Sequence, residues 1–238
     1  MLSKEAAVYA KSWASESERF GNQGLYDRLS LITPKGKVLE FGAGIGLSTV
    51  ALAADHEVLS LEGNATLVAE VRGRISSIPR ASVIETDFLD MSVETMENIR
   101  NFAPDGIVGW LLGSNVGYHE KYVRGGMSAG DVVKKYREII EDAVLSLALL
   151  LPSVQWIHFV SRGGIQAGHT VAEAERAGAD NYNEYVFHPN GFEVVSIQTF
   201  EWDQSGSEFP YVGSAHDPNE AQGSVPIITS MLARRKAG

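Results

Sequence analysis

One stretch of this chain, residues 38–49, restricts it to a small group of folds. It reads Val-Leu-Glu-Phe-Gly-Ala-Gly-Ile-Gly-Leu-Ser-Thr, an apolar run that leads directly into three alternating glycines. Glycine tolerates the positive φ angles of a sharp turn and lets the backbone approach a ligand closely. We expect a helix from Leu47 onward, whose N-terminus would point at that ligand. The stretch therefore predicts a strand, a binding turn and a helix in succession.

The rest of the chain alternates short apolar runs with helical periodicity, which is typical of an α/β fold with a mainly parallel sheet. The last two expected strands have no helix between them and should pair antiparallel. Their connection, residues 203–224, is rich in Gly, Ser, Pro, Asp and Asn, and the sequence leaves its role open between a lid, a dimer contact and a disordered tip. Helices are expected at residues 3–19, 25–32, 47–54, 64–75, 92–101, 131–150 and 170–178, and strands at 37–41, 57–61, 81–85, 107–112, 154–160, 192–202 and 225–233.

Composition narrows the classes of function. The chain has 30 acidic and 20 basic residues, a net charge of -10, and this balance argues against a nucleic-acid partner. It has no cysteine, which excludes disulfides and thiolate chemistry. No apolar signal segment is present, and the longest apolar run, residues 143–151, is too short to span a bilayer. We therefore expect a cytoplasmic protein with no membrane partner, and no spacing of His, Asp or Glu predicts a metal site.

Two classes of ligand use a glycine turn of this kind. The dinucleotide fingerprint Gly-x-Gly-x-x-Gly needs a third glycine that seats the helix against the strand. Depending on the register, that position is Leu47 or Thr49 here. In addition, Glu40 stands at the strand end, where a carboxylate would repel a pyrophosphate but attract a cation. The turn therefore favours a cationic ligand without phosphate.

Residues 39–46 resemble motif I of the class I S-adenosylmethionine (SAM) dependent methyltransferases, whose cofactor carries a sulfonium and an ammonium group. The resemblance extends over most of the chain. It implies a Rossmann-like three-layer α/β sandwich, with a seven-stranded, mostly parallel sheet and a C-terminal antiparallel strand. It further implies one domain over residues 1–238, in which an N-terminal helical cap (1–33) precedes a SAM-binding core (34–238).

The same resemblance implies which residues bind the cofactor. Glu62, after the second strand, would bind both ribose hydroxyls, although a solvated strand-end residue is the competing interpretation. Asp87 would accept the exocyclic amine of adenine, or merely cap a turn, and Phe88 would stack on the base or contact it through its backbone. Glu40 would act directly or through a water molecule. The implied cofactor set is Glu40, Phe41, Gly42, Ala43, Gly44, Gly46, Glu62, Gly63, Asp87, Phe88, Gly113 and Asn115.

The methyl acceptor should lie beside the loops that follow the fourth and fifth strands, because ligands of open α/β sheets bind at the carboxyl ends of strands. Methyl transfer requires alignment and a dry pocket, and needs a general base only when the acceptor is a hydroxyl or a protonated amine. We nominate His119 as that base with Tyr118 as its positioning partner, and His169 as the second candidate. Loop histidines without a role are the competing interpretation. Tyr9 and Trp13, in the first expected helix, either pack in the core or close over the acceptor.

The sequence from Gly113 to Tyr118 lacks the Asn/Asp-Pro-Pro-aromatic signature of family members that methylate exocyclic amines of bases, which argues against that reaction. The expected function is SAM-dependent methyl transfer to an O or N atom of a small molecule. A protein or peptide methyltransferase, a SAM-fold aminopropyl-type transferase and a non-catalytic SAM-binding module are the alternatives. The acceptor stays unidentified, and a homodimer is left open.

Overall fold

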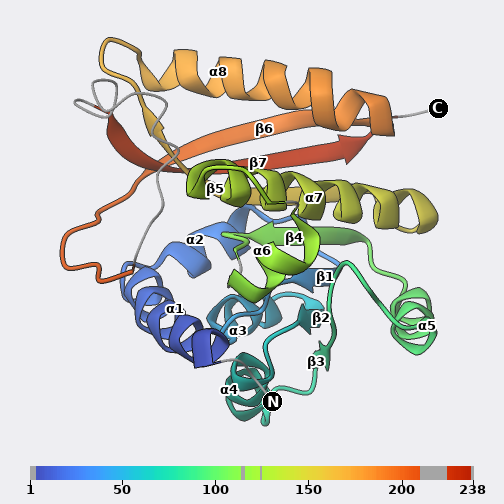
Figure 1. Ribbon diagram of the computed structural model, residues 1–238. Coiled ribbons are helices and arrows are strands. Elements are labelled where there is room, and N and C mark those ends of the chain that lie inside the picture. The colour runs from blue at the N-terminus through green and yellow to red at the C-terminus, as the bar shows by residue number, and fades with distance from the viewer. Residues whose placement is uncertain (1–3, 114–115, 124, 210–223, 237–238) are drawn as a thin grey trace.

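The computed structural model describes residues 4–113, 116–123, 125–209 and 224–236 (Figure 1). A seven-stranded sheet forms its centre, with the strand order β3-β2-β1-β4-β5-β7-β6. β7 pairs antiparallel with both β5 and β6, and every other pair is parallel. The expected fold class is thus confirmed, including the antiparallel terminal pair. The strands are β1 (Lys37–Phe41), β2 (Glu57–Glu62), β3 (Ala81–Glu85), β4 (Gly106–Trp110), β5 (Trp156–Ile165), β6 (Phe192–Glu201) and β7 (Val225–Arg235).

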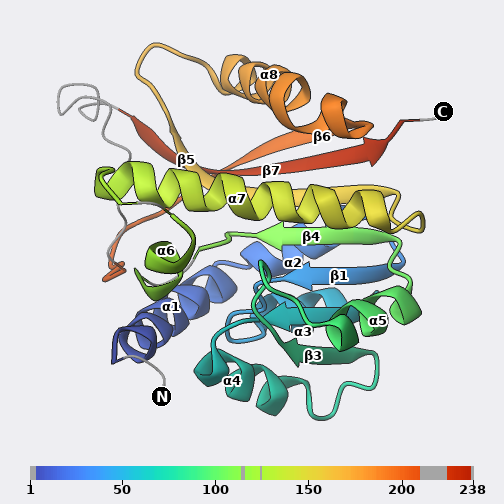
Figure 2. The ribbon, with the colours of Figure 1, turned by 45° about the vertical axis from the view of Figure 1, so that its right-hand side comes forward.

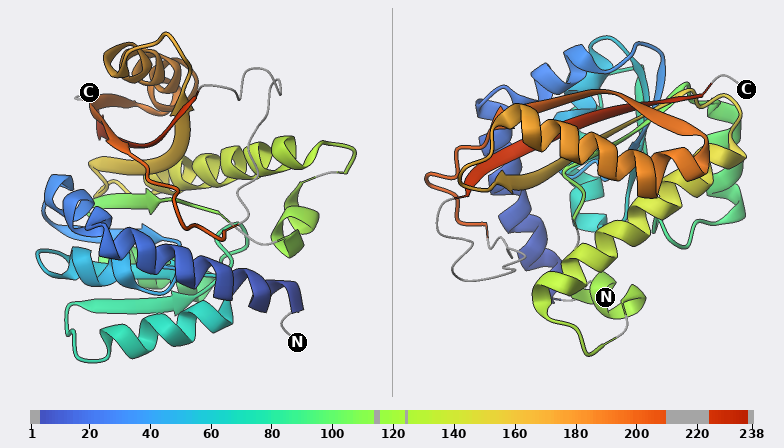
Figure 3. Two further views of the ribbon diagram at one scale, coloured as in Figure 1. Left: turned by 90° about the vertical axis from the view of Figure 1, so that its left-hand side faces the viewer. Right: turned by 90° about the horizontal axis from the view of Figure 1, so that it is seen from above.

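Helices cover both faces of this sheet, as Figure 2 shows for α7 on one of them. In Figure 3 the helix α8 lies over the outer strands β6 and β7. A π-helical turn (Asn183–Phe187) and a 3-10 turn (His188–Asn190) join α8 to β6. The α-helices are α1 (Lys4–Asn22), α2 (Leu25–Ile32), α3 (Leu47–Ala53), α4 (Ala65–Ile75), α5 (Val93–Phe102), α6 (Val116–Tyr122), α7 (Ala129–Leu150) and α8 (Val171–Tyr182).

The two faces of the central strands bury different clusters of side chains. Successive strand residues point to opposite faces, so Val38 faces the cluster that contains Ala10, Phe20 and Leu52 of α1 and α3. Leu39, its neighbour in the chain, faces the cluster formed with α5 and α7. Because both faces are buried, the strands are nearly continuous apolar runs, as parallel strands between helices usually are.

Several boundaries differ from those that the sequence predicts. β5 continues to Ile165 rather than ending at residue 160, because residues 161–165 pair with Thr229 to Val225 of β7. The helix α6 lies inside a glycine-rich segment that we expected to be a loop. The helix α7 begins at Ala129, with the Ser128 hydroxyl accepting a hydrogen bond from the Asp131 backbone N–H. Asn64 caps α4 as expected, accepting from the Thr66 N–H at 3.0 Å.

Candidate functional site

The glycine turn between β1 and α3 adopts a backbone that only glycine takes readily. Gly42, Gly44 and Gly46 all have positive φ angles, of 76°, 57° and 87°. The turn is anchored to β2 by the Gly42 N–H, which donates to the Leu61 carbonyl at 2.9 Å. Space is restricted as well, because a Cβ atom on Gly44 would lie only 2.7 Å from Nε1 of Trp13. The helix α1 therefore covers the turn.

Glu62, at the end of β2, is buried and fastened to this turn. Its Oε2 accepts a hydrogen bond from the Gly44 N–H at 2.9 Å, and its Oε1 accepts one from the Asn64 N–H at 2.9 Å. Burial raises the pKa of the Glu62 carboxyl to about 7, against the lowering effect of these backbone N–H groups, and the nearby Glu40 adds to the rise. The competing interpretation of a solvated strand-end residue does not fit, since Glu62 is 7% exposed.

Glu40 lies beneath the glycine turn, in the protein interior. Its Oε2 accepts hydrogen bonds from the hydroxyls of Thr49, at 2.6 Å, and Ser60, at 2.5 Å. Burial raises the pKa of this carboxyl above its usual range. Glu40 does not line the pocket described next, so any effect on a ligand there acts through the turn.

A pocket opens beside Glu62, at the carboxyl ends of β2, β3 and β4. The helices α1 and α6 lie next to each other over this end of the sheet (Figure 1). On one side the Asn64 amide nitrogen donates to the Ala6 carbonyl of α1 at 3.1 Å. On the other, the Tyr118 hydroxyl of α6 donates to the Gly63 carbonyl at 3.1 Å. The lining residues are Tyr9, Glu62, Gly63, Asn64, Phe88, Gly113, Tyr118 and Tyr136.

Sequence reasoning found part of this lining and missed part. Glu62, Gly63, Phe88, Gly113 and Tyr118 were expected at the site, and Tyr9 was considered as one of its covers. Asn64 was missed as a pocket residue, because Asn at the start of an expected helix is an ordinary helix cap. Tyr136 was missed, because an aromatic residue on one face of a long amphipathic helix resembles an ordinary core residue.

The Asp87 carboxylate accepts hydrogen bonds from two side chains of α6. Its Oδ2 accepts from the Tyr122 hydroxyl at 2.7 Å and from Lys121 Nζ at 2.9 Å, while its Oδ1 accepts from the Leu89 N–H at 3.1 Å. The last contact is the turn cap that we considered as an alternative role. The neighbouring Phe88 ring packs edge-on against Phe41, with 5.3 Å between the ring centroids.

The two histidines proposed as bases lie in different places. The His119 ring contacts Tyr136 edge-on, with 5.1 Å between ring centroids, so it stands one layer behind the pocket wall. Partial burial lowers the pKa of His119 below its usual value. His169 is exposed in the connection between β5 and α8 and does not line the pocket. Asn115, the remaining expected cofactor residue, is outside the described residues.

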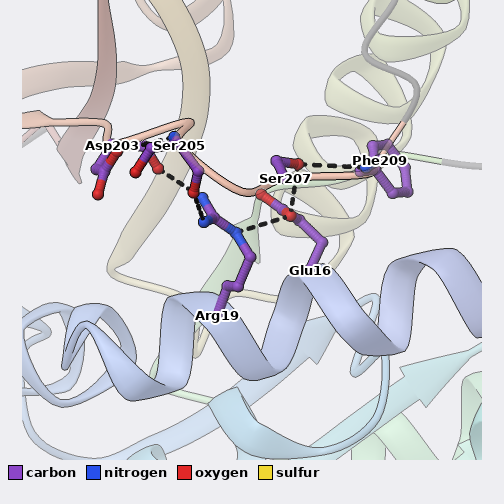
Figure 4. A network of polar contacts seen from close by, with 6 residues as sticks. All are labelled: Glu16, Arg19, Asp203, Ser205, Ser207 and Phe209. Carbon is purple, nitrogen blue, oxygen red and sulfur yellow. Dashed lines mark hydrogen bonds and ion pairs between the residues drawn. The ribbon is translucent and has the colours of Figure 1, made fainter.

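Helix α1 is held over the site by the chain segment that follows β6 (Figure 4). Arg19 donates to the carbonyls of Asp203 and Ser205 through its two terminal nitrogens, the former at 2.6 Å. Glu16 accepts from the Ser207 hydroxyl at 2.8 Å and pairs with Arg19 at 3.1 Å. The Phe209 ring packs edge-on against Tyr9 and Trp13. Residues 203–209, called the strap below, therefore fasten the helix that carries both aromatic covers.

Within the described part of the chain, no group of three or more His, Asp or Glu side chains could hold a metal ion. Among the same residues, no helix is long and apolar enough to cross a bilayer.

The sheet order, the glycine turn and the carboxylate after β2 define the fold of the class I SAM-dependent methyltransferases. Among solved structures, TYW2 of M. jannaschii in complex with AdoMet has a TM-score of 0.51 at 12% identity, over 91% of this chain and 77% of that one. The N-methyltransferase NodS of Bradyrhizobium japonicum, in complex with S-adenosyl-L-homocysteine, has a TM-score of 0.50 at 14% identity, over 93% and 88%. No family model matches the sequence, and no curated protein matches it significantly. At these identities the likeness shows the fold.

One prediction is wrong. The acidic net charge led us to argue against a nucleic-acid partner, yet TYW2, which shares this fold with a TM-score of 0.51, is an RNA methyltransferase. Net charge sums over the whole chain and does not report the charge of one face, so it could not support that exclusion.

Proposed function

We propose that this protein binds SAM at the carboxyl ends of β1, β2 and β4 and transfers its methyl group. The observation that carries the proposal is the Glu62 carboxylate, held by the Gly44 and Asn64 N–H groups at the edge of a pocket. A carboxylate has about four lone-pair sites, so Glu62 can accept two more hydrogen bonds from a ribose diol. TYW2 and NodS, with the same fold, were solved with AdoMet and S-adenosylhomocysteine bound.

The residues around Glu62 suit the remaining parts of this cofactor. Phe88 can contact the adenine, and Asp87 can accept its exocyclic amine, either at Oδ1 or in place of a partner on α6 at Oδ2. The glycine turn leaves its backbone accessible to the methionine part. SAM itself supplies a methyl group on a positively charged sulfur, which is already a good leaving group. The protein's task is therefore to align the acceptor with the methyl and to exclude water.

For the acceptor we propose an O or N atom of a small molecule, since the pocket is covered by α1, α6 and the side chain of Tyr136. RNA is the second candidate that an assay must include. Where the acceptor must lose a proton, His119 is the proposed base, because burial lowers its pKa and keeps it neutral at pH 7. An acceptor would have to reach past Tyr136 to meet it. An His119→Ala variant with unchanged turnover would exclude this role.

Titration calorimetry with SAM and S-adenosylhomocysteine tests the binding step. We expect Glu62→Gln to weaken binding of both by at least tenfold, the scale of a lost hydrogen bond to a charged group. The matched control is Glu57→Gln, an exposed residue at the other end of β2, which should bind as the unmodified protein does. If the unmodified protein binds neither compound, the proposal is wrong.

Assays with SAM that carries a radiolabelled methyl group separate the alternatives. A methyltransferase releases S-adenosylhomocysteine and labels one fraction among small metabolites, peptides or RNA. An aminopropyl-type transferase would instead release methylthioadenosine, for which it uses the decarboxylated cofactor. A protein that binds SAM and labels no fraction would be a binding module.

A further inference from the structure

Arg162 lies on the opposite side of the site from Glu62. Strand β4 ends at Trp110, which pairs with Val160, but β5 continues beyond it. The Leu111 N–H still donates to the Val160 carbonyl at 2.8 Å. Arg162 therefore projects from the part of β5 that extends past the carboxyl end of β4. Since β2, β1, β4 and β5 are neighbours in that order, the site has a carboxylate at one end and a guanidinium at the other.

The Arg162 side chain reaches the wall of the pocket. Its guanidinium carbon lies 5.3 Å from the centre of the Trp13 ring, on the helix that covers the glycine turn. A Cβ atom on Gly113 would lie 3.6 Å from Nη2 of Arg162 and 3.2 Å from the Tyr9 hydroxyl. Gly113 and Tyr9 both line the pocket. At Gly113, which has no side chain, the guanidinium therefore lies close to the lining of the pocket.

A cation at this position conflicts with a positively charged methyl donor. The sulfonium of SAM and the guanidinium would repel each other inside a partly buried site, where screening by water is weak. An anion that lies between the sulfonium and the guanidinium attracts both of these cations. Burial raises the pKa of the Tyr9 hydroxyl well above its usual value, while the positive charge of Arg162 lowers it and the negative charge of Glu62 raises it further.

We propose that Arg162 binds a carboxylate at the β4–β5 end of the pocket. The inference rests on the proposed SAM binding and deepens it. The planar guanidinium presents paired N–H donors that match the two oxygens of a carboxylate. The carboxylate can come from the methionine part of SAM or from the acceptor, and the two sources are separable by experiment.

The first arm of the test compares S-adenosylhomocysteine with 5′-methylthioadenosine, which lacks the amino-acid carboxylate. If the methionine part supplies the carboxylate, Arg162→Gln weakens binding of S-adenosylhomocysteine at least tenfold and leaves binding of methylthioadenosine within twofold. Arg162→Lys keeps the positive charge but loses the paired N–H donors. Its affinity for S-adenosylhomocysteine should therefore lie between those of the unmodified protein and Arg162→Gln. Arg100→Gln, an exposed residue of α5, is the control. Thermal unfolding of each variant checks that the fold is retained.

The second arm applies if Arg162→Gln leaves binding of S-adenosylhomocysteine unchanged. Protein loaded with that compound is titrated with benzoate and with its neutral counterpart benzamide. An acceptor carboxylate site predicts at least a fivefold preference for benzoate, lost in Arg162→Gln and reduced in Gly113→Ala, whose methyl group would lie 3.6 Å from Nη2 of Arg162. If Arg162→Gln binds S-adenosylhomocysteine and benzoate as tightly as the unmodified protein does, the inference is overturned. If the unmodified protein binds no adenosine compound at all, SAM binding itself fails, which is a distinct outcome.

Discussion

The phenolic oxygen of Tyr122 lies 2.7 Å from Oδ2 of Asp87, the carboxylate that we propose receives the adenine amine. Oδ2 of Asp87 also accepts a hydrogen bond from Lys121 Nζ at 2.9 Å. Lys121 and Tyr122, which are consecutive in α6, thus bind the carboxylate that we propose for the adenine amine. Because Oδ2 of Asp87 already accepts two hydrogen bonds, an adenine amine that approaches this oxygen competes with α6.

Removing the Tyr122 hydroxyl should strengthen cofactor binding. In Tyr122→Phe the competing hydrogen bond is absent, so we expect affinity for S-adenosylhomocysteine to rise about three- to tenfold, the scale of one hydrogen bond of roughly 1 kcal/mol. Lys121→Met should change affinity less, because exposed ion pairs contribute little. Tyr185→Phe, at an exposed tyrosine, serves as the control. Weaker binding by Tyr122→Phe in calorimetry would show that the hydroxyl supports the cofactor instead of competing with it.

The Glu62 carboxyl should make stability depend on pH. Burial raises its pKa to about 7 from its ordinary value of 4.5, so between these values the folded chain binds more protons than the unfolded chain. The contribution of Glu62 to stability is therefore complete below about pH 4.5 and is lost as the pH rises through 7, by on the order of 3 kcal/mol. Urea denaturation from pH 4.5 to 8 should show this fall in the unmodified protein and a flatter profile in Glu62→Gln. Identical profiles would contradict it.

Cofactor binding should oppose that trend. A ribose diol donates hydrogen bonds to the ionised carboxylate, so binding favours loss of the Glu62 proton. We expect affinity for S-adenosylhomocysteine to rise between pH 6 and 8, with proton release detected by calorimetry in buffers of different ionisation enthalpy. An affinity that is independent of pH in this range would indicate that Glu62 does not bind the diol in its ionised form.

The parts of the site that the sequence predicts are those that depend on residues next to one another in the chain. The glycine turn requires positive φ at three positions, and only glycine supplies these readily, so its place was readable from residues 38–49. Glu62 stands at the end of β2, where the apolar run of that strand stops. Such features depend on local backbone conformation, and the structure has the turn and the strand end where the sequence predicts them.

The parts that escaped prediction depend on contacts between distant segments. The length of β5, and with it the place of Arg162, is set by pairing with β7 more than sixty residues later. The helix α6 lies among glycines that disfavour helix, and its tyrosines are anchored on Gly63 and Asp87. The strap lies in a segment whose composition left three roles open, and its described part, residues 203–209, packs against α1.

The strap should stabilise the closed position of α1. Arg19→Ala removes the donors to the carbonyls of Asp203 and Ser205, and we expect the free energy of unfolding to fall by about 1–2 kcal/mol. Because α1 carries Tyr9 and Trp13 over the site, S-adenosylhomocysteine should also dissociate faster in stopped-flow measurements. Arg176→Ala, on the exposed side of α8, provides the comparison. If Arg19→Ala loses stability and its dissociation rate is unchanged, the strap supports the fold alone and does not control access.

His158 should govern the acid limb of the stability profile. It is fully buried, its Nε2 lies 2.7 Å from the Ser230 hydroxyl, and its Nδ1 lies 2.8 Å from the Thr33 hydroxyl. Burial lowers its pKa from 6.5 to about 3. A neutral imidazole therefore contributes stability that is complete above about pH 6.5 and is lost as the pH falls toward 3, because the unfolded chain then takes up a proton that the folded chain excludes.

A substitution that removes this ring separates its titration from its packing. His158→Phe should lower the free energy of unfolding at pH 7 by about 2–4 kcal/mol, since it removes the hydrogen bonds of the imidazole to the Ser230 hydroxyl and the Trp110 N–H and strains a filled core. Between pH 7 and 4 the variant should then lose less stability than the unmodified protein does. Ser230→Ala removes one hydrogen bond while keeping the imidazole, so its profile should be lower by about 1 kcal/mol and parallel to that of the unmodified protein. Parallel profiles for His158→Phe and the unmodified protein in urea denaturation would mean that the imidazole takes up its proton equally in the folded and the unfolded chain.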